Sequence, residues 1–70
     1  MNLPTIEQLQ EFIDAITLAN SNYIKIAVHY VGRNDAVYEA CTHDVKALGR
    51  LAGYLTYMKA SLERDNELLD

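Results

Sequence analysis

The sequence predicts an α+β domain in which two helices pack on one face of a two-stranded antiparallel sheet. Near both ends of the chain, apolar residues recur every three or four positions, which is the spacing of one helix face. Residues 23–31 instead alternate with the period of two that is typical of a strand. A turn sequence follows at residues 32–35. The predicted element order is therefore helix, strand, strand, helix.

The first helix is predicted over about residues 5–19. Thr5 and Gln8 have the spacing of a capping box, with the threonine as N-cap and the glutamine at the third helical position. One face of the segment is apolar and consists of Ile6, Leu9, Phe12, Ile13 and Ile16. Residues 19–22 include two asparagines and a serine, which favour turns and indicate the end of the helix.

The two strands are predicted over about residues 23–31 and 36–42. In the first, Ile24, Ile26, Val28 and Tyr30 occupy every second position. The alternation in the second is less regular, and a slip of one residue would exchange its faces, so the pattern leaves the hairpin register open.

The last helix is predicted over about residues 44–64, with Thr42 or Asp44 as N-cap. Its apolar stripe places Leu55 at the centre of the core, and consists of Val45, Leu48, Leu51, Ala52, Leu55, Met58 and Leu62. The last five or so residues are expected to fray, because acidic side chains at a helix C-terminus oppose the macrodipole.

An all-α fold with three helices is the alternative. Val37, Cys41, Val45 and Leu48 also lie at helical spacings, so one continuous helix from Asn34 to Leu62 fits the pattern. The hairpin is preferred because the alternation in residues 23–31 requires a strand to pair with.

Length and composition indicate a single small domain, residues 1–70, that gains stability by forming a homodimer. The open edges of a two-stranded sheet would let a second copy extend it to four strands. The single cysteine and the absence of a signal-like start predict a cytoplasmic protein, and no run of residues is apolar enough for a membrane span. The net charge of −4 disfavours direct binding to nucleic acid.

Catalytic and metal-binding patterns are weak. Cys41, His43 and Asp44 could suggest a thiol with its base, but such groups usually converge from separate parts of a fold. Metal-ligand spacings and glycine-rich phosphate loops are missing from the sequence. We therefore expect a protein that is not an enzyme and has no cofactor or metal.

Two surfaces are candidates for protein binding. Arg50, Tyr54 and Tyr57 lie away from the leucine stripe, near two glycines that leave room for another backbone, and Tyr and Arg concentrate binding energy. A secondary surface is the acidic stripe of Glu7, Glu11 and Asp14 on the first helix.

These features predict a small non-enzymatic module that binds a larger protein of unknown identity, as an inhibitor or adaptor. In size and charge alone, the chain is similar to virus-encoded inhibitors of host nucleic-acid machinery, including anti-CRISPR proteins. The alternative is a dimeric transcriptional or assembly regulator that contacts nucleic acid through a cluster of basic side chains. The basic residues would be Lys25, Arg33, Lys46 and Arg50, and a contiguous basic face would favour this alternative.

Overall fold

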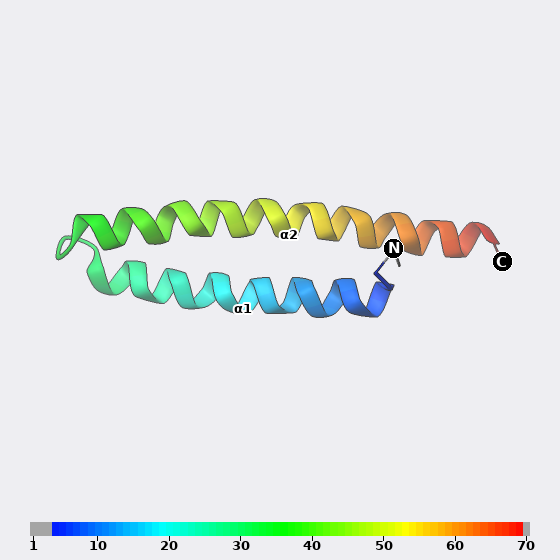
Figure 1. Cartoon of the computed structure of the whole chain (residues 1–70), viewed down its shortest axis with the longest axis horizontal. Helices are drawn as coiled ribbons and strands as arrows, with labels where there is room; N and C mark the ends of the chain where they lie inside the picture. The colour runs from blue at the N-terminus through cyan, green and yellow to red at the C-terminus, as the bar shows by residue number, and fades with distance from the viewer. Residues whose placement is uncertain (1–3, 70) are drawn as a thin grey trace.

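A computed structural model describes the backbone of residues 4–69 and the side chains of residues 4–67. It is a hairpin of two antiparallel helices, α1 (Ile6–Tyr30) and α2 (Asp35–Leu69), joined by a short turn (Figure 1). The hairpin measures 55 × 22 × 14 Å. Residues 4–69 contain no strand, so the predicted α+β class is wrong. The fold is all-α, as in the alternative, but with two helices instead of three.

The two helices meet along a seam of residues that alternate spacings of three and four. This is the pattern of helices that cross at a shallow angle. On α1 the seam consists of Ile6, Leu9, Ile13, Ile16, Asn20, Tyr23, Ala27 and Tyr30, and on α2 of Cys41, Val45, Leu48, Ala52, Leu55, Lys59 and Leu62, all of them buried or half-buried. The seam runs through Asn20, where the sequence predicted a helix end.

Residues 23–31 were predicted as a strand because apolar side chains surround this part of α1 on several sides. Tyr23, Ala27 and Tyr30 belong to the seam, whereas Ile24, Ile26 and Val28 lie on its flanks and are exposed. In sequence, the flank residues fall on every second position and imitate a strand. The helical spacing of three and four is also present in residues 23–30, where it continues the seam of residues 6–16. The link between the two parts is Asn20, whose polar side chain hides the continuity in the sequence.

The second predicted strand, residues 36–42, forms the first two turns of α2. Asn34 caps this helix, because its Oδ1 accepts a hydrogen bond from the Val37 N–H at 3.1 Å. The predicted cap Thr42 lies inside the helix, where its hydroxyl donates to the carbonyls of Tyr38 and Glu39 at 3.1 and 2.9 Å. The helix therefore starts well before the predicted residue 44.

The turn and the first cap agree with the sequence. Gly32 has a φ of 72°, which a glycine adopts without strain, and the N–H groups of Arg33 and Asn34 both donate to the Tyr30 carbonyl. At the start of α1, Thr5 and Gln8 form the predicted capping box: the Gln8 N–H donates to Oγ1 of Thr5 at 3.1 Å, and the Thr5 N–H donates to Oε1 of Gln8 at 2.9 Å.

The helix ends furthest from the turn are uneven, and we call this part of the molecule the open end. Both helices leave the turn with the same rise per residue, so residue n of α1 lies level with about residue 65 − n of α2. Residues of α2 after about position 59 therefore extend beyond α1 (Figure 1). The backbone is helical through Leu69, Asp70 lies outside the described residues, and the fraying of the tail stays a prediction.

The core is small. Within residues 4–67, Leu9 is the only large side chain that is fully buried, and Ala27 and Cys41 are the other buried residues. Leu55, predicted as the central core residue, lies in the seam but is only half-buried. A pair of helices cannot enclose a core as two layers would, so most of the seam keeps one side open to solvent.

Candidate protein-binding surface

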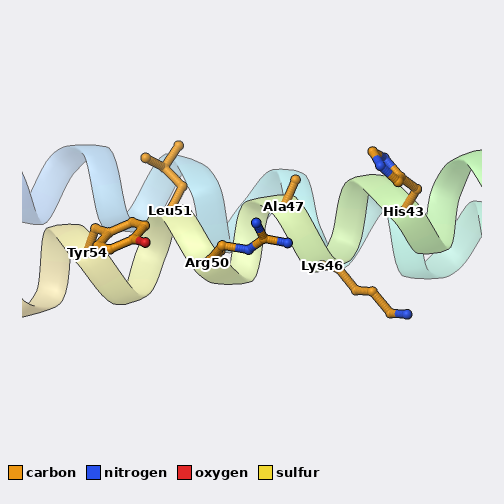
Figure 2. Close-up of a pocket in the computed structure, with 6 residues that line it drawn as sticks. All are labelled: His43, Lys46, Ala47, Arg50, Leu51 and Tyr54. Carbon is orange, nitrogen blue, oxygen red and sulfur yellow. The ribbon is translucent and has the colours of Figure 1, made fainter.

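Arg50, Tyr54 and Tyr57 lie on the side of α2 that faces away from α1. Seam residues 48, 52 and 55 define the inner side of α2, and residues 50 and 57 lie roughly opposite them on the helical wheel. Tyr54 and Tyr57 expose 65% and 72% of their surface. Figure 2 views α2 from this outer side, with Arg50 and Tyr54 on the near surface and α1 behind. The structure therefore places all three side chains in solvent, on one helix face.

A depression of about 310 Å³ lies on this face (Figure 2). Its walls combine cationic, apolar and aromatic groups, and consist of His43, Lys46, Ala47, Arg50, Leu51 and Tyr54. Tyr57 lines a second depression of about 200 Å³ nearer the open end, beside Met58, Leu62 and Pro4. A tyrosine next to an arginine is a pairing found at the energetic centres of protein interfaces.

Gly49 and Gly53 lie next to this surface, and the fold gives no packing reason for either of them. A Cβ atom added to either residue would meet no atom of the described residues within 4 Å, apart from its own helical turn. Each glycine also weakens the helix by about 1 kcal/mol relative to alanine. Gly53 precedes Tyr57 by one helical turn, so the backbone beside this tyrosine is open to another molecule.

The acidic stripe of Glu7, Glu11 and Asp14 lies on the outer face of α1, and all three residues are exposed. The Nε2 of Gln10 donates a hydrogen bond to Oδ1 of Asp14 at 2.7 Å. Because α1 and α2 turn their outer faces in opposite directions, the stripe and the Arg50 surface lie on opposite sides of the hairpin. The structure does not bring these two predicted surfaces together.

The residues that could suggest catalysis do not converge. Cys41 is buried in the seam, whereas His43, two positions later, points to the outside of α2. Among the residues that the structure describes, Asp44 is the one acidic neighbour of His43 within ion-pair distance, at 3.6 Å between Nδ1 and Oδ1. Among the residues whose side chains the structure describes, no three metal-binding groups cluster.

The four basic residues on which the nucleic-acid-binding alternative depends are divided between the two sides of the hairpin. Lys46 and Arg50 lie one turn apart on α2, Lys25 lies on the outer face of α1, and Arg33 belongs to the turn. A contiguous basic face, which would favour that alternative, is therefore not formed by these residues.

Sequence reasoning missed a groove of about 400 Å³ near the turn. It is mainly apolar, draws on both helices and is lined by Ile24, Ala27, Val28, Val31, Tyr38, Thr42, Val45 and Lys46. The spacing of Ile24, Val28 and Val31 is that of a helix flank, which could have identified the groove had the segment not been interpreted as a strand.

No family model matches this chain, and no curated protein or solved structure is significantly similar to it. Across residues 4–69, neither helix contains a stretch apolar enough to cross a lipid bilayer.

Proposed function

We propose that this chain is a non-enzymatic protein-binding module that inhibits or adapts a larger protein through the outer face of α2. The observation that carries the proposal is the combination of exposed Arg50, Tyr54 and Tyr57 with two glycines that have no packing role in the fold. Natural helices seldom retain two stability-lowering glycines in exposed interior positions without a functional or packing reason.

The chemistry of the surface favours an acidic partner. Lys46 and Arg50 supply two cations within one helical turn, and the guanidinium group of Arg50 can bind a carboxylate through two hydrogen bonds. The ring of Tyr54 adds apolar area at a low cost in side-chain entropy. The partner segment that fits best carries a carboxylate next to an apolar or aromatic side chain.

The acidic stripe on α1 offers a second, separate surface. Because Glu7, Glu11 and Asp14 face away from α2, one flat partner cannot contact both surfaces at once. An adaptor would use both surfaces, whereas an inhibitor would need only the face of α2. A cytoplasmic location remains part of the proposal, since a single buried thiol suits a reducing compartment.

Affinity capture from the cells that make the protein tests this proposal. The bait is compared as the parent, as Arg50→Ala and as the matched control Lys25→Ala, which removes an exposed cation from the outer face of α1. We expect a captured protein that Arg50→Ala loses, with a cost in binding of about 2 kcal/mol. The control should retain it.

Loss of the captured protein from both variants alike would indicate nonspecific charge attraction and would contradict the proposal. Retention by both variants would exclude the outer face of α2 as the binding site. Capture of nucleic acid that depends on Lys25 and Arg50 together would instead support the regulator alternative.

A further inference from the structure

The hairpin exposes more surface than a folded monomer of its size normally does. Its accessible surface is 5647 Å². A compact monomer of the same mass is expected to expose about 4,400 Å², an excess of about 1,200 Å². A standard protein interface removes about 800 Å² from each partner. A second copy on one face would therefore account for most of the excess, leaving the remainder for the end of α2 that extends beyond α1.

A continuous apolar flank runs along one side of the seam. It consists of Phe12, Ala19 and Ile26 on α1 and Leu51 and Met58 on α2, and we call it the apolar flank. Each of these residues follows a seam position by three. In antiparallel helices, positions three after the seam lie on the same side of the pair, so both helices contribute to one surface.

The apolar flank has few charges. Between Phe12 and Ile26, the α1 positions on this side are alanines and an asparagine. On α2, the acidic and basic residues on this side of the paired length are Asp44 and its neighbour His43, and Tyr54 adds a hydroxyl group. Four large apolar side chains of the flank are exposed, namely Phe12, Ile26, Leu51 and Met58. Solvent-facing helices normally place charged residues at such positions.

We propose that a second copy of this chain covers the apolar flank, so that two hairpins form a four-helix bundle. Its core would combine the open side of each seam with the two apolar flanks. In four-helix bundles, each helix likewise has an apolar face wide enough to pack against two neighbouring helices. Arg50 and Tyr57 stay in solvent on the outer face of α2, whereas Leu51 and Met58, which also line the depressions beside Tyr54 and Tyr57, become covered. The dimer therefore borders the proposed binding surface, and different variants test the two proposals: Leu51→Glu tests the dimer and Arg50→Ala tests the partner.

The charge distribution selects the antiparallel arrangement of the two copies. At the open end, Glu7, Glu11, Asp14, Glu63, Asp65 and Glu67 against Lys59 and Arg64 give six acids and two bases, a net −4. Two parallel hairpins would bring these like-charged ends together, at a cost in electrostatic energy. The antiparallel bundle separates the two open ends and brings Phe12 of one copy near Ile26 of the other.

Sedimentation equilibrium tests the dimer with two matched leucine variants. Leu51→Glu places a charge on the apolar flank, and Leu18→Glu places one on the exposed outer face of α1. The parent and Leu18→Glu should sediment as dimers, and Leu51→Glu should associate at least about tenfold more weakly. A parent that remains a single chain at about 100 µM, or two variants that behave alike, would overturn the proposal.

If Leu51→Glu loses its helical circular dichroism, a dilution series of the parent decides. The thermal midpoint of a dimer rises with chain concentration, whereas a midpoint that is independent of concentration would overturn the dimer.

The antiparallel arrangement is tested by disulfide formation under oxidising conditions in a Cys41→Ala background. Ala47→Cys lies halfway along the hairpin and should form a disulfide with the same introduced cysteine of the second copy. Met58→Cys lies near the end and should form no such disulfide between copies. Cross-linking at position 58 and not at 47 would overturn the antiparallel bundle.

Discussion

Cys41 and His43 are two residues apart on α2 and point to opposite sides of the helix. Cys41 exposes 6% of its surface, whereas the side chain of His43 exposes 85%. The spacing follows from helical geometry, because two steps of about 100° turn a side chain to the far side. In the strand that the sequence predicted, the same two residues would have shared one face.

Burial in the seam should make Cys41 unreactive toward thiol reagents in the folded protein. We expect modification in buffer to be at least about tenfold slower than in urea, because the reagent must wait for local opening of the hairpin. The matched control is His43→Cys in a Cys41→Ala background, whose thiol should react at the same rate in both media. A fast reaction of native Cys41 would show that α2 does not bury this position.

Truncation of Leu9 should destabilise the protein more than truncation of Leu55. Leu9 is fully buried, so Leu9→Ala should lower the free energy of unfolding by about 2–5 kcal/mol. Leu55 is half-buried and loses less contact area, so Leu55→Ala should cost about 1–2 kcal/mol. Urea denaturation measures both values. The reverse order would show that the leucine stripe of α2, and not α1, holds the centre of the core.

Replacement of Asn20 by an apolar residue should stabilise the hairpin. The Asn20 Oδ1 atom is buried in the seam and has no hydrogen-bond partner among the described residues. Asn20→Leu removes this desolvated acceptor and should raise the free energy of unfolding by about 1–3 kcal/mol. The control is Ser21→Leu at an exposed position on the side of α1 away from the apolar flank, where a change within about 0.5 kcal/mol is expected. A destabilised Asn20→Leu variant would show that the amide has a partner in solution.

Substitution of Gly53 by alanine should stabilise the protein. Gly53→Ala should raise the free energy of unfolding by about 1 kcal/mol, because an added Cβ meets no described atom within 4 Å. Gly32→Ala should have the opposite sign, since its φ of 72° is unfavourable for alanine. Thermal unfolding measures both changes. If Gly53→Ala were destabilising, the glycine would have a packing role and the argument for an open binding surface would fail.

The sequence predicts the first helix cap and the central turn correctly, but neither the helix boundaries at residues 19 and 44 nor the type of residues 23–31. Thr5, Gln8 and Gly32 act through local chemistry, and a cap or turn at these residues forms in either fold. The type of residues 23–31 depends instead on the whole of α1. Asn20 continues the seam but carries a polar side chain, so the helical period was interrupted where the strand-like alternation of Ile24, Ile26 and Val28 began.

The candidate binding surface could be predicted in part from the sequence. Arg50, Tyr54 and Tyr57 lie on a segment that is helical in both the predicted and the observed fold, so their common outer face was readable from their spacing. Their separation from Glu7, Glu11 and Asp14 depends on how the two helices pair. The apolar flank and the groove near the turn also depend on that pairing, and a sequence interpreted as a hairpin of strands could not indicate them.

Site-specific photo-cross-linking in living cells tests the proposed binding surface most directly. A photoreactive amino acid replaces Tyr57 on the outer face of α2 or, as control, Leu18 on the outer face of α1, two positions that are both exposed. We predict that position 57 yields a covalent adduct with a larger protein and that position 18 does not. An adduct of equal yield from position 18, or adducts from position 57 only with other copies of this chain, would contradict a protein-binding role for the outer face of α2.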